Sequence, residues 1–435
     1  MTRRKNLAGI LSVLLIFFTS FNAKKFLFSF SPHVNEYFSV FFYFTDIICV
    51  LLITLFFLEG GSLKRALDST SGKALAFFLV LVFFSVGFAS DAGLALYHAI
   101  RVFLYAMTTL SLSFFIQKGL VGFKTIFSTM SVSAVFQSIV GFFQFLKGSS
   151  VGLRLLGESV ITPATKGVAR VFIGGEPLLR AYGTLPHANI LGAFLGIGLL
   201  CLFYLFLSEE GHGLKGFWSR VLSLTGIFIV FLGLITTFSR SGWIVAIITT
   251  LILLIYAFWK SQFRKNALSL LSVLLVYIGI IFMILGWAIV PRAGFIPGEP
   301  SVDNRVLYNA IGIELIKDHP LGVGVGNEVS QAVSQNLYQK KGFSTWWLWQ
   351  PVHNLYILIA SEIGVLGLIT FLLFLFFLFF ESRNIKNMAF FVFSLIAVSF
   401  LLFGLFDHFM WDLPAGELMM WISIGFLLSF KKRGS

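Results

Sequence analysis

The chain has 435 residues, of which 57% are hydrophobic and 12% are charged, and its mean hydropathy is +0.91. About a quarter of the residues of an ordinary soluble domain are charged, so this composition excludes a soluble enzyme and indicates an integral membrane protein. The formal net charge is +13. In a membrane protein this excess follows from topology and from contact with membrane lipids that are anionic, so we expect no nucleic-acid binding.

Twelve apolar runs are long enough to cross the hydrocarbon core of a bilayer. In chain order they are Leu7–Phe21, Tyr37–Leu58, Ala74–Ala89, Leu94–Ile116, Ile126–Leu146, Ile190–Leu207, Val221–Phe238, Trp243–Phe258, Ala267–Val290, Leu355–Phe380, Met388–Phe406 and Leu413–Phe430. The sequence therefore predicts an all-α integral membrane protein with about 12 transmembrane helices. The two cysteines lie inside these runs and predict neither a disulfide framework nor a metal site.

Positively charged residues separate into alternate connections between the spans. Lys and Arg cluster before the first span and after every second one, whereas the other short connections hold only Lys24, Lys25 and Arg240. Because short cytoplasmic segments accumulate Lys and Arg, this distribution predicts that both termini are cytoplasmic.

Two connections are far longer than ordinary loops, and both are external on this topology. The chain thus divides into spans one to five (1–146), a first loop (147–189), spans six to nine (190–290), a second loop (291–354) and the last three spans with the tail (355–435).

The second loop is predicted to contain an amphipathic helix. Asp303 is a suitable N-cap for a helix over Asn304–Lys317, and Pro320 ends it. Its broad apolar stripe indicates that it lies against the membrane core at the external interface. Arg305 falls in its first turn.

Three glycines, Gly322, Gly324 and Gly326, follow this helix. No strand precedes them, so a dinucleotide fingerprint is excluded, and their tolerance of positive φ predicts a tight backbone path.

Several motifs in order resemble those of the bacterial O-antigen ligase and O-antigen polymerase superfamily. They are Thr236 to Gly242 (TTFSRSG), Asp303 to Arg305 (DNR), Asp318 to Gly324 (DHPLGVG), and His353 to Tyr356 (HNLY) with Glu362 and Gly364. The resemblance covers roughly Arg180 to Gly367, while the first five spans are similar only as generic membrane helices.

The resemblance implies an enzyme of the bacterial inner membrane that works at the periplasmic face. Such proteins move a glycan from an undecaprenyl pyrophosphate-linked donor to an acceptor hydroxyl, without a metal or another cofactor, by a displacement that inverts the anomeric centre. It also implies that Arg240, Arg305 and His353 are the catalytic residues.

Physical chemistry agrees with these assignments. Guanidinium groups bind phosphate oxygens bidentately and stay charged, and they stabilise the charge that builds on a departing pyrophosphate. A neutral imidazole is suited to accept the proton of the attacking hydroxyl, and this role falls to His353.

Each of these residues also has a structural interpretation. Arg240 would extend to the lipid headgroups, Arg305 would lie on the polar side of its helix, and His353 would cap the next helix together with Asn354. Glu362, roughly 13 Å further along that helix, argues against the interpretation of His353 as a cap only, because a carboxylate is unusual in a lipid-facing span.

Further substrate-binding candidates accompany Asn354 and Glu362. Arg180, His187 and Asn189 resemble a family segment that binds sugar or phosphate, or they form a hydrogen-bonded turn with Asn189 as the helix cap. Asp407 and His408 either orient His353 and the acceptor hydroxyls or belong to a solvated turn.

Buried charges need partners inside the bilayer. Asp46, about halfway along the second span, and Arg101, on the fourth, are expected to pair with each other.

Two classes of function follow. The first is glycan transfer, led by an O-antigen ligase whose acceptor is lipid A-core, with a polymerase that extends the glycan as the alternative. The second is a twelve-helix secondary transporter, which the external position of the charged residues disfavours because carriers bind near the midplane.

Overall fold

The structure is a computed structural model that describes residues 2–32, 35–209, 211, 213–294, 300–384 and 386–431. Each of the twelve predicted spans coincides with a helix, and eight helices of this described part are long and apolar enough to cross a membrane. Only two short hairpins of strands interrupt the helical fold, so the all-α membrane class is confirmed.

The first half of the chain holds seven helices, two 3₁₀ turns and all four strands. They are α1 (Thr2–Phe18), β1 (Lys24–Ser29), β2 (Ser39–Tyr43), α2 (Phe44–Leu58), α3 (Leu63–Leu67), α4 (Thr70–Ser85), η1 (Val86–Phe88), α5 (Ala92–Gln117), α6 (Phe123–Lys147), η2 (Arg154–Leu156), β3 (Arg170–Ile173), β4 (Glu176–Leu179) and α7 (Ala188–Leu207).

The regular elements described in the second half are all helices or 3₁₀ turns. Its elements are α8 (Gly213–Thr236), α9 (Arg240–Trp259), α10 (Ser261–Ala293), α11 (Pro300–Asp318), α12 (Glu328–Ser334), α13 (Leu337–Lys340), η3 (Trp346–Leu348), α14 (Leu355–Ser382), α15 (Met388–Phe403), α16 (Phe409–Asp412) and α17 (Pro414–Leu428).

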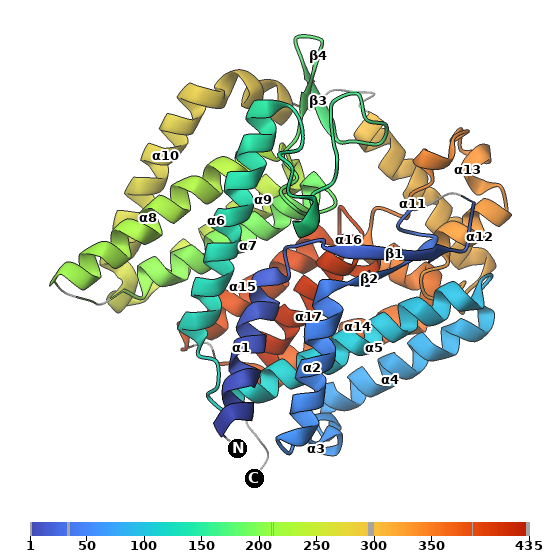
Figure 1. The fold of residues 1–435 in the computed structure, drawn as a ribbon, viewed down its shortest axis with the longest axis horizontal. Helices are drawn as coiled ribbons and strands as arrows, with labels where there is room; N and C mark the ends of the chain where they lie inside the picture. The colour runs from blue at the N-terminus through green and yellow to red at the C-terminus, as the bar shows by residue number, and fades with distance from the viewer. Residues whose placement is uncertain are drawn as a thin grey trace.

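The start of α1 and the last described residues after α17 lie close together, near α3, whereas the β3–β4 hairpin and the helices α11 to α13 lie at the opposite side of the bundle (Figure 1). These distant parts come from the two long connections. Their common position away from the termini is the arrangement that the charge distribution predicts.

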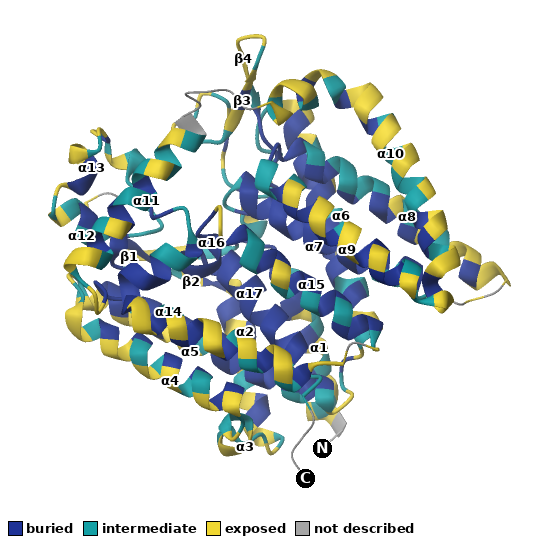
Figure 2. Cartoon of the chain, turned by 180° about the vertical axis from the view of Figure 1, so that it is seen from behind, coloured by how far each residue is buried: buried dark blue, intermediate teal, exposed yellow. Residues whose placement is uncertain are grey.

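Helix α7 forms the centre of the bundle. The share of buried residues in its apolar span is 89%, against 17% for the peripheral α10, and Figure 2 shows the same contrast. A Cβ on Gly192 of α7 would meet the Cβ of Ser239 at 2.9 Å. Small residues allow such close approach between membrane helices, so α7 brings the start of α9 against its own first turns.

The second predicted span is wrong at its start. Residues 39–43 form β2, which pairs antiparallel with β1. The run Ser39–Tyr43 is rich in β-branched and aromatic residues, which favour strands, and its apolar character merges without a break into α2.

This shift moves Asp46 from the middle of a helix to its first turn. There its carboxylate accepts a hydrogen bond from the backbone N–H of Tyr43 at 2.9 Å. The carboxylate also faces the guanidinium of Arg101, with both N···O distances at 3.3 Å. Tyr97 and Tyr105 accept further hydrogen bonds from Arg101. The predicted ion pair is therefore present.

The second long loop differs from the expectation in two places, at the end of the helix before it and at the start of its own first helix. Helix α10 continues through Pro291 to Ala293, and α11 begins at Pro300, so Asp303 lies within the first turn instead of at the N-cap. Pro fits the first turn of a helix because that turn needs no N–H donor there. Ile311 and Leu315 of α11 are fully buried, while Val306 and Ile313 are exposed, so only part of the predicted stripe packs.

The three glycines after α11 adopt positive φ, as predicted. The glycine run lies beside α14 at the point where Gly364 (φ 78°) interrupts the helical backbone conformation of that helix. Val323 and Gly324 donate their N–H groups to the carbonyls of Ser361 and Glu362, both at 2.9 Å. The glycine run thus binds the carbonyls near this kink, and the second loop is fastened to α14.

The substitution Asp46→Asn should destabilise the protein strongly, because it leaves the charge of Arg101 buried without its partner. We expect a loss of about 3–5 kcal/mol in the free energy of unfolding, measured by SDS titration in mixed micelles. The double variant Asp46→Asn/Arg101→Met should recover most of this loss. Equal losses in the single and double variants would contradict a coupled pair.

Candidate functional site

The candidate residues meet where the first turns of α7 and α14 approach α11 and the connection between α15 and α17. Asn189, in the first turn of α7, lies at the centre of this region. Its side-chain nitrogen donates to Asp407 Oδ2 at 2.8 Å, and its oxygen accepts from Arg180 Nη2 at 2.6 Å. One amide therefore joins the first long loop to the turn before α16.

Two glutamines of α6 hold the segment before α7 in place. Gln137 accepts from the backbone N–H of Thr184 at 2.8 Å, and Gln144 accepts from those of Tyr182 and Gly183. Gly183 has a positive φ of 61°, which suits glycine. Sequence reasoning missed both glutamines, because a polar residue within a membrane helix does not reveal its partner.

Three arginines bring positive charge to this region. Arg180 is buried, and its hydrogen bonds go to neutral groups, the amide of Asn189 and the carbonyl of Thr237 at 2.7 Å. Burial, together with the charges of Arg292 and Arg305, lowers the pKa of Arg180 to about 9. Arg292, which sequence analysis missed, ends α10 and donates to the carbonyl of Phe238 at 3.1 Å.

Arg305 acts on the same cluster from α11. Its charge contributes to the lowered pKa of His353 and of Asp407. Its Nε is buried and meets no hydrogen-bond acceptor within the described chain. The guanidinium group therefore has donors available for a ligand.

His353 precedes α14 and stacks on the ring of Tyr308, with the ring centroids 5.2 Å apart. Its Nδ1 lies 2.9 Å from the carbonyl oxygen of Pro351. Because a carbonyl only accepts hydrogen bonds, Nδ1 carries the proton and Nε2 has the lone pair. Burial and the neighbouring charge of His408 lower the pKa of His353 to about 3, so the ring is neutral.

His408 has the opposite tendency. Although burial disfavours its charged form, the carboxylate of Asp412, 2.7 Å from Nδ1, raises the pKa of His408. The rings of His408 and His353 are 4.8 Å apart and nearly perpendicular. Burial alone would raise the pKa of Asp407, but the charges of His408, His353 and Arg305 lower it. The site thus pairs a histidine whose pKa is lowered with one whose pKa is raised.

Other predicted residues have structural partners. His187, not Asn189, is the N-cap of α7, because its Nδ1 accepts from the N–H of Asn189 at 3.1 Å. Burial and the charge of Arg180 lower the pKa of His187 to about 3, which keeps this nitrogen an acceptor. Asn354 caps α14 by accepting from Tyr356 and Ile357.

Glu362 lies deeper in the protein than His353. The indole N–H of Trp411 donates to its carboxylate at 2.6 Å, and only 2% of the residue is exposed. Its carboxylate also approaches the N–H of Glu328 at 3.5 Å. These contacts join α14 to α12 and α16.

Arg240 starts α9 directly after its N-cap, Ser239, whose hydroxyl lies 3.3 Å from the Asn189 oxygen. The Nη1 atom of Arg240 lies 3.5 Å from the carbonyl oxygen of Gly294, which follows α10. Arg240 thus borders the cluster, one residue from a direct contact with Asn189. The positive end of the helix dipole adds to its charge there.

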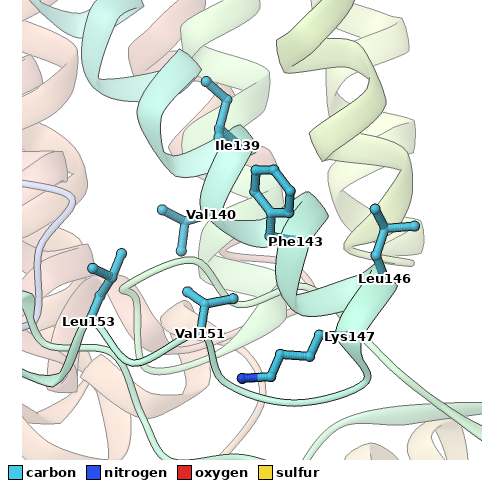
Figure 3. Close-up of a pocket in the computed structure, with 7 residues that line it drawn as sticks. All are labelled: Ile139, Val140, Phe143, Leu146, Lys147, Val151 and Leu153. Atoms are coloured by element: carbon cyan, nitrogen blue, oxygen red, sulfur yellow. The ribbon is translucent and has the colours of Figure 1, made fainter.

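A hollow of about 530 Å³ lies beside the end of α6 (Figure 3). Its lining is apolar except for Lys147, which donates to the carbonyl of Ser150 at 3.0 Å. None of the candidate residues lines it. Within the described part of the chain, no group of three or more His, Cys, Asp and Glu residues is arranged to hold a metal ion.

Comparison with known families gives one match. Residues 225–372 match the family described as O-antigen ligase. This stretch contains Arg240, Arg305 and His353, whereas Arg180 to Asn189 and the turn with Asp407 and His408 lie outside it. No curated protein matches the chain.

The substitution Asp412→Asn should lower the pKa of His408, because it removes the carboxylate that stabilises the imidazolium. The measurement is a pH titration of ¹⁵N-histidine signals of the full-length protein in micelles, assigned with His408→Gln. Asp318→Asn, which removes an exposed carboxylate at the end of α11, is the control and should leave the titration unchanged. An unchanged pKa in Asp412→Asn would refute the ion pair.

Proposed function

Because residues 225–372 match the family described as O-antigen ligase, we propose that the protein transfers a glycan from undecaprenyl pyrophosphate to an acceptor hydroxyl. The family implies glycosyl transfer with a lipid-linked glycan and a lipid acceptor. The specific donor, the acceptor and the roles of individual residues are our proposal. One observation supports it best. The positive charges of Arg180, Arg292 and Arg305 influence one another, and His353, whose Nε2 is available as a base, lies in the same region.

The arginines provide the donor site. Arg180 and Arg305 oppose each other's charge, and this repulsion is relieved when an anion lies between them. A pyrophosphate diester carries two negative charges and enough oxygen atoms for several guanidinium groups. Arg240 is proposed as a further phosphate ligand, because its charge adds to that of a helix N-terminus. The lipid chain then extends into the surrounding membrane.

His353 is the proposed general base. The acceptor oxygen attacks the anomeric carbon and its proton moves to Nε2 of His353, while the bond from that carbon to the phosphate oxygen breaks. The electron pair of this bond stays on the pyrophosphate, where Arg305 stabilises it. Attack opposite the leaving group inverts the anomeric configuration. Every step uses side chains of this protein.

The pair of His408 and Asp412 supports this base. Burial and the positive charge of His408 in its protonated form disfavour a positive charge on His353, so we propose that His353 is neutral before the reaction. Asp412 raises the pKa of His408 and fixes its ring. Asp407 joins His408 to Asn189 and thereby couples the base to the arginines.

We favour a ligase with lipid A-core as acceptor over a polymerase that extends the glycan. Both activities use the same donor chemistry, and they differ in the hydroxyl that attacks. A secondary transporter receives no support, because the family match is to glycan transfer.

The deciding experiment incubates the purified full-length protein with undecaprenyl pyrophosphate-linked glycan and lipid A-core in detergent. Glycan-bearing lipid A-core is the expected product. Lengthening of the lipid-linked glycan instead would make the protein a polymerase. Correctly folded protein that forms neither product would overturn the proposed function.

In this assay, His353→Ala should lower kcat about 10²–10⁴-fold, the usual contribution of a general base. Arg305→Gln should lower kcat about 10²–10³-fold, as expected when one group that stabilises transition-state charge is removed. The matched controls are His319→Gln and Lys317→Gln, the latter removing a positive charge from the exposed side of the same helix. Equal effects of Arg305→Gln and Lys317→Gln would contradict a specific role.

The pH profile tests the state of His353. A base acts in its neutral form, and a pKa lowered to about 3 keeps His353 neutral well below pH 6.5. The rate constant kcat/KM should therefore stay level as the pH falls from 7.5 to 5.5, whereas an ordinary histidine would reduce it about tenfold. A single acid limb near pH 6.5 would show that burial and His408 do not act as proposed.

A further inference from the structure

A second cavity lies at the side of the bundle that holds both termini, away from the candidate site. Its volume is about 920 Å³. It lies between α3, the start of α4, the ends of α5 and α14, and the last described residues after α17. Figure 1 shows these segments gathered beside the two termini. The charge distribution predicts that this side is cytoplasmic.

The cavity has an apolar wall and a charged rim. Phe114 contributes partly exposed aromatic surface from α5, and the more deeply buried Phe56 of α2 and Leu110 of α5 also line the cavity. Arg65 and Arg383 lie at the rim, and both are exposed to solvent. A free polar ion would gain nothing from the apolar wall, whereas an amphipathic molecule contacts both surfaces.

The rim has unneutralised positive charge. The carboxylate of Glu381 is occupied, since Lys431 Nζ lies 3.1 Å away and the N–H of Ser71 donates at 3.2 Å. The hydroxyl of Ser71 donates to it as well. Asp68 is the other acidic residue of the lining, which also contains two arginines, Arg65 and Arg383. Beyond the Glu381–Lys431 pair, the rim therefore has a net positive charge.

Both arginines are free to turn towards a ligand. Arg65 donates through Nη2 to the carbonyl of Gly60 at 2.9 Å, which leaves its other N–H groups for an anion. Arg383 lies near the ring of Phe380, with its guanidinium carbon 5.7 Å from the ring centroid. Exposed contacts of this kind are weak, so an anionic ligand competes with them easily.

We propose that this cavity binds one anionic phospholipid of the facing leaflet. The phosphodiester accepts hydrogen bonds from Arg65 and Arg383, and one acyl chain lies along Phe56, Leu110 and Phe114. Basic pockets between transmembrane helices on the cytoplasmic side bind anionic headgroups in this way. The lipid would connect α3, α5 and α14, which are distant in sequence. This inference is independent of the proposed function.

The test is native mass spectrometry of the full-length protein, titrated with phosphatidylglycerol, with phosphatidylcholine or with inorganic phosphate. We expect phosphatidylglycerol to bind at least about tenfold more tightly than phosphatidylcholine, and Arg65→Gln/Arg383→Gln to remove this preference. The matched control is Arg264→Gln/Lys265→Gln, which removes two exposed charges from α10 on the same predicted side of the membrane. It should keep the preference.

Three results would overturn the proposal. One is equal binding of the two lipids by the wild type, and another is an equal loss in the control variant. The third is binding of inorganic phosphate as tight as that of the lipid, which would make the rim a free-anion site. Arg65→Lys/Arg383→Lys keeps the charge and should retain the preference, which separates loss of binding from misfolding of the glutamine variant.

Discussion

The side-chain amide of Asn189 is the contact on which the candidate site depends. Its oxygen accepts from Arg180 and its nitrogen donates to Asp407, so a cation of the first long loop and an anion of the turn after α15 are held without touching. An amide has a donor and an acceptor on two separate atoms, whereas an ionised carboxylate only accepts and a hydroxyl makes both bonds through one atom. Because Asn189 lies in the first turn of α7, whose apolar span is 89% buried, packing holds it in position. The rest of the site is therefore built outward from a rigid helix.

The fold was largely predictable because the bilayer imposes simple demands on a sequence. A span must be long and apolar, and every predicted span coincides with a helix. A buried charge must find a partner inside the protein, and this requirement alone identified the pair of Asp46 and Arg101. The approach of Arg305 and His353 to one cluster was inferred from the resemblance of their motifs, and the charge of Arg305 acts on His353 in the structure.

The errors arose where one residue type serves two purposes. Ser39–Tyr43 is apolar enough for a membrane span, yet its partner strand β1, which the hydropathy of one segment does not reveal, makes it a strand. His187 and Asn189 both suit a helix cap, and the structure assigns the cap to His187, while the side chain of Asn189 binds Asp407, far away in the sequence. The predicted substrate-binding role of Glu362 stays a prediction, but its partner, the indole of Trp411, was also not foreseen. Gln137 and Gln144 position a whole loop, and their spacing on α6 gave no sign of it. In each case the deciding partner comes from a distant part of the chain.

Some buried charges of the protein are paired with an opposite charge, and others are not. We interpret the paired charges as structural and the unpaired ones as candidates for binding a ligand. At Asp46 and Arg101, and at Glu381 and Lys431, each buried or half-buried charge lies against an opposite charge, which offsets the cost of desolvation. Around Asn189 the positive charge is not matched in this way. The hydrogen bonds of Arg180 end on neutral groups, and the two largest causes that lower its pKa are burial and the charge of Arg292. Such an arrangement is unfavourable in the empty protein and becomes favourable when an anion arrives. The gain is largest when negative charge is most concentrated, which for glycan transfer from a pyrophosphate is the moment when the glycosidic bond breaks. In the proposed reaction, this excess of positive charge would therefore favour the transition state over the bound donor.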